Sequence, residues 1–492
     1  MKVHITRPLI YSLLTAHLAG CTVGPDYVRP EAAVPKEFKE SKGWKQAQPR
    51  DTVLSGKWWE IFNDSRLNEL EEQVAAANQS IIQAEAQYRQ AQHLVQSAQS
   101  AFFPLLNLTG TTNRFRAASG QSVAVSGVRN LFGVAGAIAW EPDLWGSVRR
   151  QVEANTGSAQ ASAATLQALR LSSQATLAQD YFQLKILDEQ KAVLDEIVAV
   201  NSKTLQITKN RYTVGVAAKS DVVQAETQLE SVRAQAINLG VQRATLEHAI
   251  AVLIGKPPSE LSLAPAPLNV QPPAIPVSLP SELLERRPDI AAAERQIAAA
   301  NAQIGVAKAA YYPTLNLAAS NGFQTSTLDN LFKTASRYWA FGPAGAALTA
   351  FDGGAKNAQY KQSIDSFDAN VAAYRQTVLT GFQEVEDNLA TLRILEEETQ
   401  VQDKAVDAAN QALKLTINQY QAGTISYLNV IIAQTAALSN RQTAVQLHGE
   451  RLTASVQLIK ALGGGWNTAM LPSPDQAGGE TKWTDYLIFP VE

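Results

Sequence analysis

Long stretches free of proline dominate the pattern of the chain. Residues 147–212 and 355–420 each run for 66 residues with no proline and one glycine, so little interrupts helical hydrogen bonding there. A glycine-bearing turn and a second helical stretch follow each run, at 220–255 and 428–463. At about 1.5 Å per residue, each longer helix would be about 100 Å long. A seven-residue register in the first run, typical of packed rods, relates Leu177, Leu184, Val198 and Leu205.

Two shorter segments alternate instead with period two, which is typical of strands. In 105–140, Leu106 and Leu108 alternate with polar residues, and a second series alternates with Gly and Ala. The segment 314–350 repeats this arrangement, and a helical stretch, 67–103, precedes the first segment. Aromatic residues lie at the segment ends: Phe102, Phe103, Trp140, Trp145, Tyr311, Tyr312 and Trp339. Such hairpins fit a lipid-facing sheet with rings at the interfaces, and a small soluble sheet capping a helical bundle is the alternative.

The chain is internally duplicated. AFFPLLNL at 101–108 returns as AYYPTLNL at 310–317, and the Tyr-x-x-Gly of Tyr212 returns at Tyr420. We therefore expect two units, 58–255 and 281–463, whose helices and hairpins follow the same order. They are joined by a connector, 256–280, with eight prolines, which disfavours helix and central strand. An extended arm, 21–57, and a tail, 464–492, complete a mostly α fold with a small membrane β part.

The N-terminus has the features of a secretion signal. Lys2 and Arg7 precede a mostly apolar segment, 9–19, which is too short to span a bilayer. The following Leu-Ala-Gly-Cys resembles the bacterial lipobox and ends at Cys21, the only cysteine of the chain. We expect residues 1–20 to be removed and Cys21 to carry a covalent lipid. No intramolecular disulfide is possible, and a chance cysteine beside an ordinary cleavage site is the alternative.

Composition and strand number narrow the function. The net charge of -3 is too acidic and too unclustered for a nucleic-acid binder. No run of eighteen apolar residues follows the leader, so a membrane crossing would have to use strands. Two hairpins supply four strands, whereas a closed barrel needs at least about eight. The chain is therefore expected to be a homo-oligomer; a dimer would supply eight strands and a trimer twelve, which leaves a channel.

Several motifs in order resemble TolC-like outer-membrane factors of tripartite efflux systems, in the lipoprotein branch. They are Cys-x-Val-Gly-Pro-Asp-Tyr at 21–27, Trp58-Trp59, Arg286-Arg287-Pro288-Asp289-Ile290 with Glu294, Asp143 to Gly146, Phe351 to Gly354, and ALGGGW at 461–466. The resemblance implies a homotrimer with a twelve-stranded outer-membrane β-barrel and a periplasmic helical barrel. It also implies docking to a periplasmic adaptor and an RND-type inner-membrane pump, and export of drugs, toxic compounds or metals. A type I secretion conduit and a periplasmic coiled-coil lipoprotein without a pore are the alternatives.

The two turns between long and return helices are the candidate functional site. Gly215 and Gly423 stand where a helix end favours positive φ, and Ser220 or Asp221 could cap the next helix. The resemblance makes these turns the periplasmic mouth. The resemblance implies that the gate of this mouth is formed by Asp221, Tyr420, Ile425, Asn429 and Ile432. Where the family has charged residues at the gate, this chain has Ile425, Asn429 and Ile432. This difference favours a constriction of apolar side chains over a ring of charged side chains that binds cations. The alternative is that both isoleucines pack between helices.

The same turns are the expected adaptor contacts, through Gly215, Val216, Ser220, Gly423 and Thr424. No catalytic site is expected, because the five histidines are scattered and none has the spacing of a metal ligand. Neither a nucleophile elbow nor a paired carboxylate motif stands out. No metal or cofactor is expected besides the lipid on Cys21.

Overall fold

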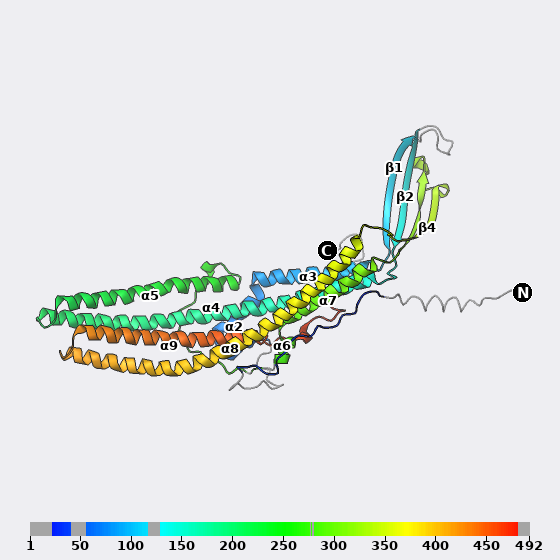
Figure 1. Ribbon diagram of the computed structural model, residues 1–492. Helices are drawn as coiled ribbons and strands as arrows, with labels where there is room; N and C mark the ends of the chain where they lie inside the picture. Colours follow the sequence, from blue (N-terminus) through cyan, green and yellow to red (C-terminus); the bar gives the residue numbers. More distant parts are fainter. Residues whose placement is uncertain (1–21, 41–55, 117–127, 276, 278–279, 481–492) are drawn as a thin grey trace.

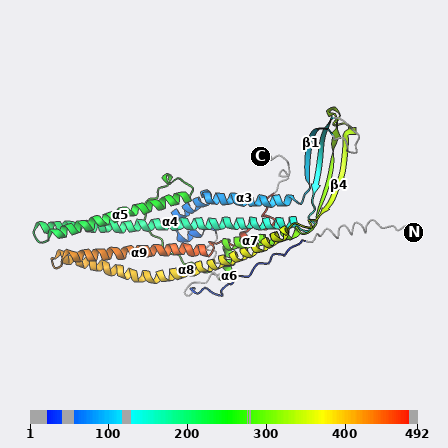
Figure 2. The ribbon, with the colours of Figure 1, turned by 45° about the horizontal axis from the view of Figure 1, so that its top comes forward.

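The computed structural model describes residues 22–40, 56–116, 128–275, 277 and 280–480. The described chain is a long helical body with a small sheet at one end (Figure 1). The helices of the body run nearly parallel to one another, and the sheet projects beyond them (Figure 2). No described helix combines the length and the apolar character needed to cross a membrane.

Two helical hairpins form the body, as the proline-free runs predict. The first joins α4 (Ser147–Thr213) to α5 (Lys219–Leu253), and the second joins α8 (Ala355–Gln421) to α9 (Tyr427–Ala461). α4 packs against both α5 and α9, and α9 packs against α8. The rods therefore lie in the order α5, α4, α9, α8, with both turns at the same end (Figure 1). The heptad residues Leu177, Leu184 and Leu205 are buried.

Shorter helices brace the other end of the rods. They are α2 (Ser65–Ala77), α3 (Gln79–Ser100), α6 (Pro280–Arg286) and α7 (Pro288–Ala309), with short 3-10 helices at Trp58–Phe62, Pro258–Glu260 and Thr468–Met470. Two further 3-10 helices, Leu328–Asn330 and Thr334–Ser336, lie in the connection between the third and fourth strands of the sheet. The expectation of one helix over 67–103 is wrong, because Asn78 divides it into α2 and α3. The Asn78 side chain accepts hydrogen bonds from the N–H groups of Ser80 and Ile81, so it caps the second helix.

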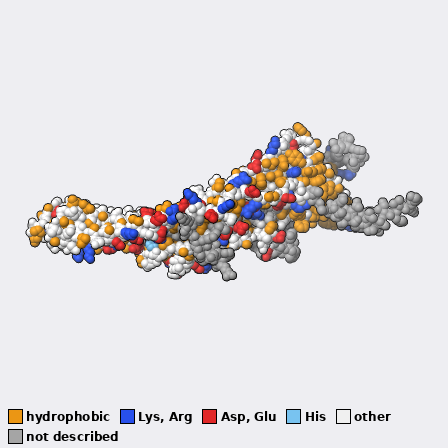
Figure 3. All heavy atoms as spheres, turned by 60° about the horizontal axis from the view of Figure 1, so that its bottom comes forward, with side chains coloured by type: hydrophobic (Ala, Val, Ile, Leu, Met, Phe, Trp, Pro, Cys, Tyr) orange, Lys and Arg blue, Asp and Glu red, His pale blue; other side chains and the backbone are white. Residues whose placement is uncertain are grey.

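One antiparallel sheet contains both strand pairs. Its order is β1 (Leu105–Arg116), β2 (Val128–Trp140), β3 (Thr314–Thr325) and β4 (Arg337–Ala347). Register and alternation give the sheet two faces. Facing residues of the apolar face are Leu106, Ile138, Ala319 and Phe341, and those of the polar face include Asn107, Ala137, Ser320 and Ala340. The period-two prediction is confirmed, and hydrophobic side chains gather at this end of the molecule (Figure 3).

The largest hydrophobic core lies where the short helices meet the rods, and we call this region the belt (residues 58–100, 150–184, 280–309, 374–392 and 452–466). Trp58, Leu67, Phe182, Ile290 and Val385 are among its buried residues. The rods beyond the belt contain two smaller clusters, one around Ile197 and Val232 and one around Leu229 and Tyr427. The belt therefore holds the two hairpins together, and the rods extend from it.

Buried Arg287, from the Arg-Arg-Pro-Asp-Ile motif, joins three elements of the belt. Its guanidinium forms a two-point pair with Asp289, at 3.0 and 2.7 Å. It also donates to Glu384 of α8 at 2.7 Å and to the carbonyl of Ala461 at the end of α9 at 3.0 Å. The motif therefore has a structural role, because it fixes the start of α7 against the second hairpin.

Candidate functional site

The two turns at the free end of the rods have the same backbone design. Gly215 and Gly423 have φ values of +79° and +81°, in the left-handed region that glycine adopts without strain. The N–H of Val216 donates to the carbonyl of Arg211, and the N–H of Thr424 donates to that of Gln419. Each long helix thus ends in a Schellman-type turn, and the prediction that both glycines adopt a positive φ at a helix end is confirmed.

The predicted capping of α5 by Ser220 or Asp221 is wrong. α5 begins at Lys219, its N-cap position is Ala218, and no side chain caps it. Asp221 instead lies in the first helical turn, where a carboxylate interacts favourably with the helix dipole. The physical reason is the compact turn, which places residue 218 rather than 220 at the extended position before the helix.

Tyr420 joins the two hairpins near their tips. It is buried, and its Oη lies 3.1 Å from Oγ1 of Thr208 on α4. Arg211 of α4 donates to the carbonyl of Tyr420 at 2.7 Å, and its guanidinium stands over the Tyr420 ring at 4.8 Å. A hydrogen bond, a carbonyl contact and a cation–π contact therefore connect the first hairpin to the second. We call Thr208, Arg211 and Tyr420 the tip joint.

Tyr427, the first residue of α9, extends this joint toward Asp221. The rings of Tyr420 and Tyr427 are 5.5 Å apart. Burial raises the pKa of Tyr427 to about 12, with smaller contributions from nearby Tyr420 and Asp221. Tyr420, a predicted gate residue, therefore lies beside Tyr427, and Asp221, a second one, is near enough to influence the charge of its hydroxyl. Neither Tyr427 nor Arg211 was identified from the sequence, although Tyr420 and Tyr427 bracket the second turn and Arg211 lies in the last turn of α4.

The other three gate candidates lie apart from the tip joint. Ile425 is half-buried against the cluster that contains Leu229 and Val430. Asn429 is exposed and donates to Oγ of Ser426. Ile432, on α9, is 59% exposed. Within one chain, the two isoleucines thus differ: one packs against the rods and the other faces outward.

The five predicted adaptor-contact residues are all exposed in the single chain: Gly215, Val216, Ser220, Gly423 and Thr424. Both glycines leave their turns without a side chain at the point where the chain reverses. Two apolar residues of the first turn, Val214 and Val216, are 73% and 61% exposed. Exposed apolar side chains at a narrow end suit contact with another protein surface better than chemistry on a small molecule.

A buried polar layer separates the two hydrophobic clusters of the rods. Asn201 and Thr204 of α4 and Gln434 of α9 are almost inaccessible to solvent. Gln434 donates weakly to Oγ1 of Thr204 at 3.5 Å. Within the described part of the chain, both polar side-chain atoms of Asn201 and Oε1 of Gln434 have no hydrogen-bond partner. Unpaired buried groups of this kind cost free energy, so this layer weakens the packing between the two hairpins.

Cys21 lies outside the described residues, but the arm that follows it is firmly docked. The N–H of Val23 donates to the carbonyl of Trp145 at the base of the sheet, at 3.1 Å. Buried Arg150 of α4 pairs with Asp26 at 2.8 Å and also contacts the carbonyls of Val23 and Gly24. The arm therefore begins beside the sheet, at the end of the molecule where the apolar face lies.

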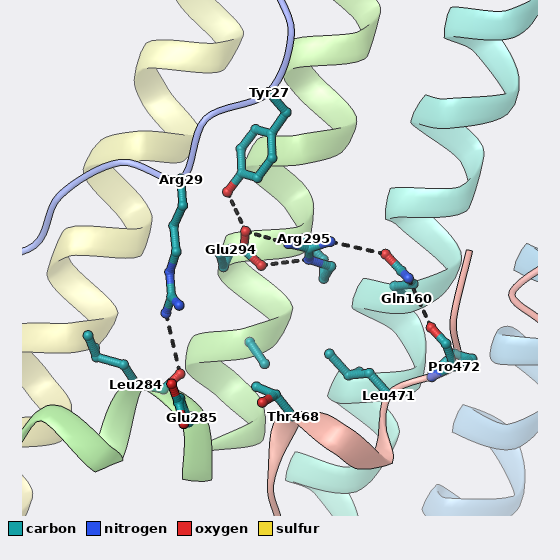
Figure 4. Close-up of a pocket in the computed structure, with 11 residues that line it drawn as sticks. Tyr27, Arg29, Gln160, Leu284, Glu285, Glu294, Arg295, Thr468, Leu471 and Pro472 are labelled. Atoms are coloured by element: carbon teal, nitrogen blue, oxygen red, sulfur yellow. Dashed lines mark hydrogen bonds and ion pairs between the residues drawn. The ribbon is translucent and has the colours of Figure 1, made fainter. Parts of the chain in front are cut away.

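A second contact of the arm borders a cavity of about 400 Å³ between α7 and the C-terminal segment. Tyr27 donates to Glu294 of α7, which forms a two-point pair with Arg295 (Figure 4). Gln160 accepts from Arg295 and donates to the carbonyl of Pro472 at 2.9 Å. Burial and the bond to Glu294 raise the pKa of Tyr27 well above its usual range. These polar groups satisfy one another, so they serve to hold the arm.

The described residues contain no group of three or more His, Cys, Asp or Glu side chains arranged to hold a metal ion. His93 contacts Gln96, and His448 contacts the carbonyl of Val270. The first contact lies within α3, and the second joins α9 to the connector.

Comparison with known proteins gives the same picture. The model of the outer membrane efflux protein family matches residues 70–256 and 279–464. A relative described as a probable efflux pump outer membrane protein, TtgC of Pseudomonas putida, is 31% identical over 97% of this chain and 99% of its own length. The outer membrane protein OprJ of Pseudomonas aeruginosa is 30% identical, with 92% and 95% covered.

Solved structures are similar over nearly the whole fold. The outer-membrane channel OprN gives a TM-score of 0.85 at 29% identity, covering 91% of this chain and 100% of that one. The open state of the Neisseria gonorrhoeae MtrE outer membrane channel gives 0.81 at 28% identity, covering 90% and 98%. The family model, the related sequences and the solved structures all match this chain over most of its length. The chain is a member of the outer membrane efflux protein family.

Proposed function

We propose that three copies of this chain form one continuous tube, a passive exit duct that carries drugs, toxic compounds or metals across the outer membrane. The sheets would combine into a twelve-stranded barrel, and the rods would continue the wall into the periplasm. The family is that of efflux channels, which are not enzymes, and we propose that this chain catalyses no reaction.

The open edges of the sheet carry this proposal. β1 and β4 are the two edge strands of the single chain, and the face that contains Leu108, Val134 and Phe341 is apolar and accessible. In lipid, each unpaired backbone group costs several kcal/mol. Pairing β1 of one copy with β4 of the next would remove both edges, and four strands per copy reach a water-filled lumen with three copies.

The polar face of the sheet is suited to line that lumen. It consists mainly of small or polar residues, including Asn107, Thr109, Asn316, Ser320 and Gln324, whose facing positions follow from the strand register. Such a lining offers few specific contacts to a solute. The selection of substrates would therefore rest with the inner-membrane pump.

The arm and the tip would connect the duct to its surroundings. The lipid expected on Cys21 would enter the outer membrane one residue before the docked segment that starts at Thr22. At the other end, the exposed turns around Gly215 and Gly423 would meet a periplasmic adaptor, which in turn would connect the channel to an RND-type inner-membrane pump.

For the mouth we propose closure by an apolar constriction at Ile425 and Ile432, steadied by Asp221 and Tyr420. Ile432 is exposed in the single chain, and Asn429 adds no charge to the ring. A mouth without a carboxylate ring at these positions would bind divalent cations weakly. We expect millimolar Mg²⁺ or Ca²⁺ to leave the conductance nearly unchanged, and Ile425→Asp to create a strong divalent block; strong block in the unmodified protein would contradict the constriction.

The duct itself is tested by recording purified, lipidated protein in planar bilayers. We expect discrete conductance steps from detergent-stable oligomers. A matched variant, Phe341→Asp, places a charge on the apolar face of β4 and should reduce the frequency of insertion, whereas Ala340→Asp changes the neighbouring residue on the polar face and should insert normally. Correctly folded, lipidated protein that forms no detergent-stable oligomer and gives no conductance would overturn the proposal.

A further inference from the structure

The end of the sheet furthest from the helical body, where the chain turns from β1 to β2 and from β3 to β4, is basic (Figure 1). Residues 105–140 and 314–347 contain one acidic residue, Asp329. Their five basic residues all lie at this end: Arg114, Arg116, Arg129, Lys333 and Arg337. All five side chains are exposed, and none has a hydrogen-bond or ion-pair partner among the residues that the structure describes. This end therefore carries positive charge that the described chain does not neutralise.

The strand register places three of these charges on the apolar face of the sheet. Arg337 is the first residue of β4, and Trp339 follows two residues later on the same face, toward the helical body. Arg114 and Arg116 continue this face on β1, because they follow Leu108 at even spacing. An arginine at the rim of an apolar face can rest its methylene groups on that face and extend its charged end into water. These positions therefore suit the boundary between hydrocarbon and headgroups.

A groove of about 600 Å³ lies on the apolar face, next to Arg337 on the side of the helical body. It is open, because Trp339 and Phe341 are 74% and 85% exposed. Its larger side chains are those of Leu106, Ile138, Trp339 and Phe341, and small residues between them, among them Gly136 and Ala319, leave the space. An open, mostly apolar groove of this kind suits an acyl chain better than a polar solute.

The loop between β3 and β4 brings a second charge to the same rim. The rings of Phe332 and Phe323 pack edge to face with their centroids 5.7 Å apart. Phe323 is paired with Arg337 in the strand register and lies on the apolar face. The loop therefore folds toward this face, and Lys333, the residue after Phe332, lies near Arg337 rather than far out in solvent.

We infer that Arg337 and Lys333 bind the phosphate of a lipid whose acyl chain lies in the groove below them. Both side chains bind phosphate oxygens well, and arginine can use two N–H groups at once. Basic residues beside a membrane-spanning segment favour anionic headgroups. A phosphate site directly above an apolar groove matches the two parts of a lipid molecule, and a soluble anion would leave the groove unused.

The position of the site selects one class of lipid. The inference rests on the proposed duct, in which the helical body extends into the periplasm. The loop end of the sheet then lies in the outer leaflet, whose lipid is a phosphorylated glycolipid anchored by lipid A. We therefore assign the site to this glycolipid rather than to a phospholipid of the inner leaflet.

Native mass spectrometry of the purified, lipidated protein in detergent tests the headgroup contact, with diphosphorylated lipid A as the probe. We expect the native protein to bind it and Arg337→Gln to bind about tenfold more weakly, because a charge-assisted contact is lost. The matched control is Arg129→Gln. Arg129 is paired with Phe115 on the polar face, so this variant loses the same charge from the same end and should bind normally.

Filling the groove tests the acyl contact separately. A Cβ atom at Gly136 would lie 3.4 Å from Cδ2 of Leu108 and 3.8 Å from Cδ1 of Leu106, which are ordinary contacts. Gly136→Leu should therefore fold, occupy the groove and weaken the binding of lipid A while channels still form. Ala137→Leu changes the next residue, on the polar face, and should leave the binding of lipid A unchanged.

Unchanged binding in Arg337→Gln, an equal loss in Arg129→Gln, or equal binding of lipid A stripped of its phosphates would overturn the site. Phosphatidylglycerol bound as tightly as lipid A would overturn the assignment to the glycolipid of the outer leaflet. Each of these results, obtained with protein that conducts, would leave the proposed duct intact. Protein that forms no oligomer and gives no conductance would instead overturn the proposed function.

Discussion

The belt and the rods use the same kind of helix but are stabilised in different ways. In the belt, a large core of buried side chains surrounds ion pairs such as those of Arg287 and Glu294, although Trp58, Trp59 and Glu71 also keep unpaired polar atoms there. In the rods, two small clusters are separated by a layer in which Asn201 and Gln434 keep unpaired atoms. The difference indicates that the belt fixes the two hairpins as a unit and that their free ends can separate more readily.

The strongest test of the belt is Arg287→Ala. The change removes bonds to Asp289, Glu384 and the carbonyl of Ala461. We expect a loss of about 2–4 kcal/mol, below the cost of breaking a fully buried pair because both carboxylates keep some contact with water. Thermal unfolding of the purified protein measures it. The matched control is Arg286→Ala, because the ion pair of Arg286 with Glu282 is exposed. If both variants lost the same amount of stability, the three bonds of Arg287 would not be what stabilises the belt.

The belt also contains one group that should weaken it at high pH. Glu71 is fully buried, neither carboxyl oxygen has a partner among the described residues, and burial raises its pKa well above the usual value. A carboxyl with a raised folded-state pKa contributes stability below its unfolded pKa and loses it as pH rises through the folded pKa. Glu71→Gln should therefore unfold at a higher temperature than the native protein at pH 8, by an amount that shrinks toward pH 5.

Exposed Glu72, paired with Lys57 at 2.5 Å, provides the control for that experiment. Glu72→Gln should change stability little, by less than about 1 kcal/mol, at either pH. If Glu71→Gln gave the same difference from the native protein at pH 5 and pH 8, the titration of Glu71 would not be its cause.

In the rods, we expect a substitution in the buried polar layer to stabilise the protein. Asn201→Leu replaces an unpaired polar side chain by an apolar one of similar size between two hydrophobic clusters. We expect a gain of about 1–3 kcal/mol in the local opening free energy, since the desolvation penalty is removed. Slower hydrogen exchange along α4 and α9 near this layer would report it. Gln206→Leu, at an exposed position on α4, should leave exchange unchanged, and slower exchange in both variants would point to helix propensity instead.

The smallest effect is expected at the tip joint. Tyr420→Phe removes the contact between the Tyr420 hydroxyl and Oγ1 of Thr208 but keeps the ring beneath Arg211. We expect faster hydrogen exchange at the two turns, corresponding to about 0.5–1.5 kcal/mol. Exposed Tyr212 supplies the control, because Tyr212→Phe loses no buried contact. If hydrogen exchange at the two turns were unchanged in Tyr420→Phe, the Tyr420 hydroxyl would not stabilise the tip joint.

Features that repeat along the sequence could be predicted, and features fixed by a single distant contact could not. Heptads and period-two alternation identified the rods and the two faces of the sheet, because burial repeats along each element. The break at Asn78 depends on one side chain bonding to its own backbone. Arg211 meets its partner Tyr420 across 209 residues, and no local pattern reports such a contact. The start of α5 at Lys219 likewise follows from the turn geometry, against the capping residues that its sequence offers.

The central claim is that one chain is incomplete at both of its edges and that three copies complete one another. Native mass spectrometry of the purified, lipid-bearing protein in detergent tests this claim most directly. The account predicts one species of three chains, each carrying a lipid on Cys21. A stable single chain that stays in solution without detergent would contradict it.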